Sequence, residues 1–131
     1  MDNTIAQIIE HVREKQLALD NVLRITKEIE ERFGNNDAPG AEMALDLRME
    51  EILSAQASDE EIELIFDKMD IAKALRMGKI VKLQVADMEL SEDEQQLYNL
   101  YKNIKSIVDR TIEIDKRLSK KIGGASSLYN N

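Results

Sequence analysis

The sequence predicts an all-α fold, an elongated antiparallel helical bundle or coiled coil with three long helices and one short helix. One proline and five glycines in 131 residues, with 43% hydrophobic and 34% charged residues, are typical of a domain built from long helices. Apolar residues recur at steps of three and four over long stretches, which is the spacing of one face of a helix. We expect one helical bundle domain at residues 1–124 and a loose C-terminal tail at residues 125–131.

The first predicted helix covers residues 3–33 and ends at a loop. Its apolar seam has a heptad-like spacing, which three polar residues, Lys15, Gln16 and Thr26, interrupt. The seam consists of Ile5, Ile8, Ile9, Val12, Leu19, Val22, Leu23, Ile29 and Phe33. The segment GNNDAPG, residues 34–40, is the densest cluster of turn-forming residues in the chain, so we expect a loop there.

Two further helices are expected between this loop and residue 89. A short second helix, ending near residue 56, has an apolar seam that consists of Leu45, Met49, Ile52 and Leu53. Ser58 and Glu61 then have the spacing of a capping box, in which each side chain accepts a hydrogen bond from the backbone N–H of the other residue. We therefore expect a long third helix from residue 59 to residue 89.

The fourth helix is marked at both ends. Ser91 and Glu94 form a second capping box, and the acids at its start and the bases near its end suit the helix dipole. Gly123 and Gly124 supply the conformation that ends helices. Because so few residues separate this helix from the third one, we expect a tight antiparallel hairpin between them.

Charge and the N-terminal residues narrow the class of protein. Residues 1–70 hold 18 acids and 7 bases, whereas residues 71–131 hold 8 acids and 11 bases. An acidic first half argues against nucleic-acid binding, which depends on phosphate neutralisation by Lys and Arg. The start MDNTIAQIIEHV does not resemble a secretory signal, and no apolar run reaches the roughly 20 residues of a membrane span. We expect a soluble, cytoplasmic protein.

The residue patterns of known catalytic and metal sites cannot be written in this sequence. His11 is the only histidine, so neither an H-E-x-x-H zinc helix nor a di-iron bundle site can form. There is no cysteine for thiolate chemistry, and the acidic clusters lack the spaced oxygen ligands of a calcium loop. We expect no enzymatic activity, no cofactor and no metal, with His11 as a surface residue.

The predicted third helix carries a second apolar stripe from residue 64 to residue 88. The short second helix could cover about half of a stripe this long, so the half from residue 75 onward is the expected binding site for an amphipathic helix, from a partner or from a second copy. Its two lysines would favour a partner helix with acidic edges. The predicted partner-binding residues are Leu75, Gly78, Lys79, Val81, Lys82, Val85 and Met88.

Residues 66–122 resemble the flagellar type III export chaperones of the FliT and FlgN type. The resemblance lies in the segment FDKMDIAKALRMGKIVKLQ and in the capped helix LSEDEQQLYNLYKNIKSIVDRTIEIDKRLSKKI, with a looser match in the first helix. It implies a cytoplasmic protein without catalysis that shields an aggregation-prone helix of a secreted, filament-associated subunit. Helix-in-groove binding would be the mechanism.

Two other functions fit the same sequence. A structural coiled-coil scaffold would use its apolar seams for self-association, as the heptad-like runs permit. A small regulator would sequester a transcription factor or an ATPase through its acidic first half. The expected state is a monomer or a homodimer, with a protein as the partner in each case.

Overall fold

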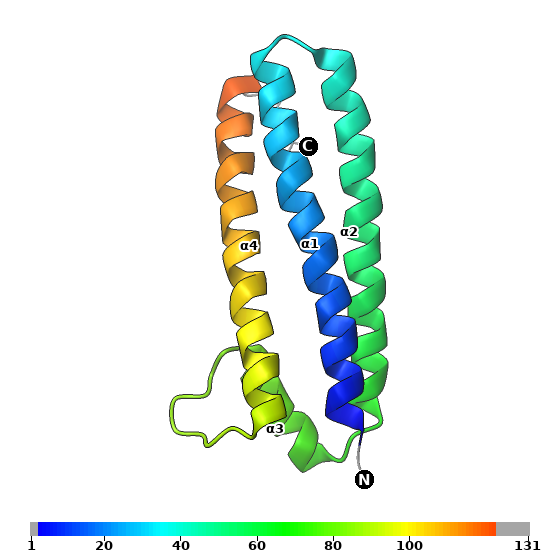
Figure 1. Ribbon diagram of the computed structural model, residues 1–131, viewed down its shortest axis with the longest axis vertical. Helices are drawn as coiled ribbons and strands as arrows, with labels where there is room; N and C mark the ends of the chain where they lie inside the picture. Colours follow the sequence, from blue (N-terminus) through cyan, green and yellow to red (C-terminus); the bar gives the residue numbers. More distant parts are fainter. Residues whose placement is uncertain (1–2, 123–131) are drawn as a thin grey trace.

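The computed structural model describes residues 3–122, which form a bundle of four α-helices (Figure 1). The helices are α1 (Thr4–Gly34), α2 (Ala38–Asp67), α3 (Ile71–Val81) and α4 (Glu92–Ile122). This confirms an all-α bundle with three long helices and one short helix. Within residues 3–122, no helix is both long and apolar enough to cross a membrane. The predicted stop at Gly123 and the tail at residues 125–131 lie outside the described residues.

Helix α1 lies between α2 and α4, and α3 crosses the end of the bundle at which α1 begins (Figure 1). We call the half of the bundle at this end the lower half and the other half the upper half. Helix α2 runs antiparallel to α1, whereas α4 runs parallel to it (Figure 1). Because α3 is too short to return along the bundle, the tight antiparallel hairpin expected between the third and fourth helices is absent from the described residues.

The short helix is the third, not the second as predicted. Helix α2 continues through Ser58 and Glu61 to Asp67, so the capping box expected at these residues does not form. Ser58 is instead buried in the middle of the helix. The reason is that a buried face repeats every seven residues through this region, at Ala41, Arg48, Ala55 and Ile62, and the helix has no cause to stop.

The predicted third helix, residues 59–89, is broken twice. Asp70 caps the start of α3, because its carboxylate accepts a hydrogen bond of 2.9 Å from the backbone N–H of Lys73. After Val81 the chain turns at Leu83, whose φ of 61° lies in the left-handed region, and the N–H of Gln84 donates to the carbonyl of Lys79 at 2.8 Å. This closes α3 in the manner of a Schellman motif without glycine. The chain then follows a non-helical path to Ser91.

The core has two parts because α3 reaches only the lower half of the bundle. The lower core takes side chains from all four helices, with a buried centre made of Ile8, Ile9, Val12, Ile62, Met77, Ile80, Leu97 and Ile104. The upper core takes side chains from three helices only, with a buried centre made of Leu23, Ile25, Ile29, Ala44, Ile107, Ile114 and Leu118. Helix α3 therefore covers the lower half of the bundle and leaves the upper half uncovered.

The face that α2 buries is made largely of small residues. Ala41, Ala44 and Ala55 are at most 6% exposed, whereas the residues that α1 buries in the upper core are leucine and isoleucine. Small side chains on one helix allow the large side chains of its neighbour to pack closely against the backbone. In the upper half, Leu45 is the large aliphatic residue of α2 that packs against the core, while Leu47, Met49 and Leu53 are exposed.

The different settings of the two serines can be tested by replacing each with alanine. In the one capping box that does form, the Ser91 hydroxyl accepts from the N–H of Glu94 at 3.2 Å, and the Glu94 carboxylate accepts from the N–H of Ser91 at 2.9 Å. We expect Ser91→Ala to lower the free energy of unfolding by ~1 kcal/mol. Ser58→Ala, inside a helix, should change it by no more than about 0.5 kcal/mol, since alanine favours helix. Urea unfolding measures both, and an equal loss in the two variants would contradict a continuous α2.

Candidate protein-binding surface

Four large apolar residues of α2 form a stripe along one flank of the helix, beside the face that packs on α1. We call Leu45, Met49, Ile52 and Leu53 the α2 stripe. Met49 and Leu53 are each 55% exposed, while Leu45 and Ile52 are half-buried. The sequence predicted these four residues as the apolar seam of the second helix. Leu45 does pack against the upper core, whereas Met49 and Leu53 are exposed because alanines of α2 occupy the buried positions. The steps of four, three and one residues between the four stripe residues place them along one side of the helix.

The α2 stripe continues in weaker form toward the lower half of the bundle. Leu64, which is 53% exposed, lies three turns beyond Leu53 on nearly the same side of α2. A second exposed pair, Met43 and Leu47, lies on the opposite flank of the helix. Five of the nine large apolar side chains that are exposed in the described residues therefore belong to α2. More of the exposed large apolar residues belong to α2 than to the other three helices together.

Acidic side chains lie along one edge of the α2 stripe and around its continuation toward Leu64. Helix α2 contains nine acids and one base, Arg48. Six exposed acids lie beside the stripe or along its continuation toward Leu64, and none of them forms an ion pair with residues 3–122. These six acids, which we call the acidic rim, are Glu42, Asp46, Glu50, Glu60, Glu61 and Glu63.

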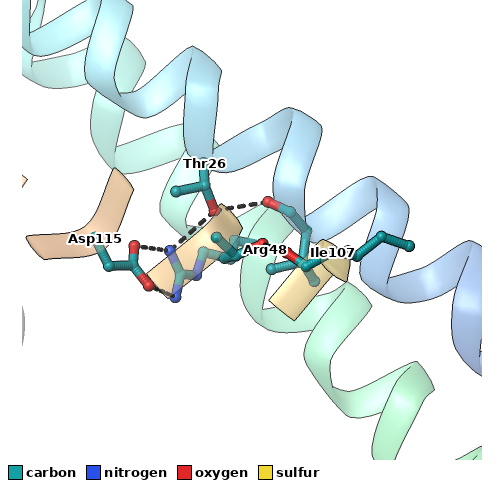
Figure 2. A network of polar contacts seen from close by, with 6 residues as sticks. Thr26, Arg48, Ile107 and Asp115 are labelled. Atoms are coloured by element: carbon teal, nitrogen blue, oxygen red, sulfur yellow. Dashed lines mark hydrogen bonds and ion pairs between the residues drawn. The ribbon is translucent and has the colours of Figure 1, made fainter. Parts of the chain in front are cut away.

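The single base of α2 joins the two outer helices. Figure 2 shows Arg48 reaching from α2 to Asp115 on α4. Its Nη1 and Nη2 donate to the two Asp115 carboxylate oxygens at 2.6 and 2.9 Å, and Nη1 also donates to Thr26 Oγ1 on α1 at 3.0 Å. The side chains of Arg48 and Asp115 are only 14% and 7% exposed. A paired fork of this kind has a fixed geometry, so it sets the rotation of α2 and keeps the α2 stripe turned outward.

Two of the polar residues that interrupt the predicted seam of α1 take part in contacts between helices. The Thr26 hydroxyl donates to the carbonyl of Val22 at 2.6 Å while accepting from Arg48. Lys15 lies 2.8 Å from the carboxylate of Asp59 on α2 and above the ring of Tyr101 on α4. Sequence reasoning missed both contacts, although a polar residue inside an apolar seam is a signal that it has a buried partner.

The structure separates the residues that the sequence predicted as a partner-binding site. Val81, Val85 and Met88 pack against the lower core, whereas Leu75 is 66% exposed and stands on the outer side of α3. Among the others, Gly78 is half-buried and both Lys79 and Lys82 are exposed. The continuous helical stripe behind the prediction is wrong, because α3 ends at Val81. Partner binding by these residues stays a prediction.

An ion pair beside the capping box fastens α3 to α4. The Nε and Nη2 of Arg76 donate to the Glu94 carboxylate at 2.6 and 2.9 Å, and Nη2 also donates to the carbonyl of Glu89 at 2.6 Å. The two bonds from Arg76 to this carboxylate, together with that from the Ser91 N–H, outweigh the effect of burial and lower the pKa of Glu94 from 4.5 to about 2. The same carboxylate thus caps α4 and holds α3 in place.

The remaining chemistry of the described residues is sparse. His11 is half-buried, with its Nδ1 3.7 Å from the carboxylate of Glu14. Residues 3–122 contain no group of three or more His, Asp or Glu side chains placed to hold a metal ion. Comparisons of the chain with protein-family models, with curated proteins and with solved structures found no match.

The buried pair between α2 and α4 should be sensitive to removal of one partner. We expect Arg48→Met to lower the free energy of unfolding by about 3–5 kcal/mol, because it leaves the Asp115 carboxylate buried without its counter-charge. Adding Asp115→Leu to this variant should recover much of the lost free energy of unfolding. Lys105→Met, which breaks an exposed pair with Asp109, is the matched control and should change stability little. A loss in Arg48→Met as small as that of the control would contradict the structural role of the pair.

The lowered pKa of Glu94 predicts a pH-dependent contribution to stability. Above pH 4.5 the carboxylate is ionised in both the folded and the unfolded chain, so its stabilisation is fully present. As the pH falls from 4.5 toward 2, the unfolded chain binds the proton first and the stabilisation is lost. Glu94→Gln should therefore be clearly less stable than the wild type at pH 7, with most of this difference gone at pH 2.5, just above the folded-state pKa of about 2.

Urea unfolding at a series of pH values measures this difference. Glu92→Gln provides the control, since Glu92 is an exposed acid of the same helical turn that forms no ion pair with residues 3–122. The difference between this variant and the wild type should be small at every pH. A gap between Glu94→Gln and the wild type that stays constant from pH 7 to pH 2.5 would mean that the ion pair with Arg76 contributes nothing.

Proposed function

We propose that this protein is a non-catalytic, cytoplasmic binding protein that shields an amphipathic helix of a partner protein. The resemblance of residues 66–122 to flagellar export chaperones makes a helix of an exported, filament-associated subunit the first partner to test. Binding of such a helix is helix-in-groove recognition, in which apolar residues at steps of three and four enter the surface of the receptor.

The observation that carries this proposal is the exposure of the α2 stripe. Soluble proteins rarely leave contiguous large apolar residues exposed unless these residues bind something. Here Met49 and Leu53 are exposed although the same helix buries alanines against α1. A sequence selected only for a stable bundle would place its leucines inside and its alanines outside. The reversed arrangement supports a role for the α2 stripe outside the bundle.

The dimensions of the surface suit one helix of a partner. From Leu45 to Leu64 the stripe and its continuation extend over roughly 29 Å, or about five helical turns. Helix α3 packs against α4 and the lower core, so it does not cover the flank beside Leu45 and Met49. The flank is long enough to pack against one helix, and no other helix within residues 3–122 covers it.

A pull-down from the native host tests the proposal. We expect the tagged wild type to retain a specific partner protein, identified by mass spectrometry, and the double variant Met49→Gln with Leu53→Gln to lose it. Leu17→Gln is the matched control, because Leu17 is 64% exposed but lies on α1. Circular dichroism should show the same helix content in all three proteins. Equal retention of the partner by the double variant would reject the α2 stripe as the binding site.

The alternative of a self-associating scaffold is tested separately. Light scattering coupled to size-exclusion chromatography gives the mass of the protein in solution. A binding protein with an open surface should be a monomer or a dimer at micromolar concentration. A larger stable oligomer that the double variant dissociates would favour the scaffold.

A further inference from the structure

We infer that the helix bound by the α2 stripe is cationic, with Lys or Arg along the edge of its apolar face that meets the acidic rim. This inference rests on the proposed function and adds the chemical class of the partner. It follows from the exposed charges beside the stripe that form no ion pair with residues 3–122, which are all acidic.

The acidic rim is in register with the stripe. Glu42 lies one helical turn before Leu45, Asp46 one turn before Met49, and Glu50 one turn before Leu53. Each exposed apolar side chain therefore has a carboxylate beside it on the same surface. A helix lying on the stripe would bring its own edge residues next to these carboxylates.

The acids of the rim differ from those that face other helices of the bundle. Where an acid faces another helix, the chain supplies a base: Glu30 binds Arg117 at 3.0 Å, Asp59 binds Lys15 at 2.8 Å, and Asp115 binds Arg48. The rim carboxylates have no such base among residues 3–122. Their negative field is thus uncompensated on the side from which a partner would approach.

This field selects between partners. Bases at the edges of a bound helix would pair with the rim, which speeds encounter and fixes register, whereas acids there would be repelled. An anionic membrane surface would be repelled for the same reason. Met49 adds tolerance to the apolar part of the contact, because methionine adapts its shape to different side chains. Charge therefore provides most of the selectivity and the apolar stripe provides the adhesion.

A second copy of the chain is a less suitable occupant. The outer side of α3 combines exposed Ile71 and Leu75 with Lys79, so it has the right charge. However, Met77 and Ile80 on the other side of α3 are held in the lower core. This helix can offer two large apolar residues, whereas the stripe and its continuation present a surface of about five turns. A separate cationic helix fills the surface better.

Two synthetic peptides test the inference. Both have about 18 residues and the same leucine positions at steps of three and four, one with lysine at the edge positions and the other with glutamate. We expect the lysine peptide to bind about tenfold or more tightly than the glutamate peptide, and less tightly as salt is raised. Fluorescence anisotropy of labelled peptides measures both affinities.

Variants locate the interaction. Asp46→Asn with Glu50→Gln should weaken binding of the lysine peptide several-fold without changing the fold, because both residues are exposed and form no ion pair with residues 3–122. Leu53→Gln should weaken it as well, and Leu17→Gln should leave it unchanged. Lysine-peptide binding that survives Leu53→Gln would overturn the inference, because the peptide would then lie elsewhere.

The remaining outcomes separate this inference from the proposed function. If the glutamate peptide binds as tightly as the lysine peptide and Leu53→Gln weakens both, the inference is wrong and the proposed function stands. If neither peptide binds at millimolar concentration, the inference and the helix-binding function both fail. If the free protein is a dimer that Leu75→Gln converts to a monomer and that excludes both peptides, the occupant is a second copy and the inference is overturned.

Discussion

The position of α1 between α2 and α4 is the constraint on which the rest of the molecule depends. Both outer helices pack on α1. Arg48 on α2 links them directly, because its guanidinium donates two hydrogen bonds to Asp115 on α4 and a third to Thr26 on α1. The alanines of α2 face α1 and allow close approach, so Met43, Leu47, Met49 and Leu53 lie on the flanks of the helix. The buried ion pair then holds α2 in this rotation. Exposure of the α2 stripe is therefore a consequence of how the three long helices pack.

The short helix α3 explains why only the lower half of the bundle is covered. Helix α3 has 11 residues, and it is held at the lower end by its own buried residues and by the bond between Arg76 and Glu94. The Glu94 carboxylate both binds Arg76 of α3 and caps the start of α4, so the position of α3 and the start of α4 are stabilised together. In the upper half the α2 stripe has no covering helix among the described residues. The acidic rim beside it has the chemistry of a surface that attracts cations.

The sequence predicted those elements whose signals are local. The seam of α1 and the capping box of Ser91 specify their helices directly, because spacing and hydrogen-bonding capacity are properties of neighbouring residues. The break at Leu83 was missed because a leucine there adopts a conformation usually taken by glycine. The candidate surface was missed because large aliphatic residues predict burial, and only the packed structure reveals that alanine fills the interface of α2. Ser58 shows the same limit, since its spacing to Glu61 is that of a cap but its place in the fold is mid-helix.

The most direct test of the account is the site of contact, and the methionines of the chain report it. Five lie in the described residues, with Met49 in the α2 stripe, Met43 on the opposite flank of α2, Met77 buried in the lower core, and Met69 and Met88 packed against that core. Methyl-labelled methionine NMR during titration with a lysine-edged amphipathic peptide would show which of them the peptide approaches. We expect the largest shift at Met49 and little change at Met77 and Met88. Largest shifts at Met77 and Met88 would place the helix beside α3 and contradict this expectation.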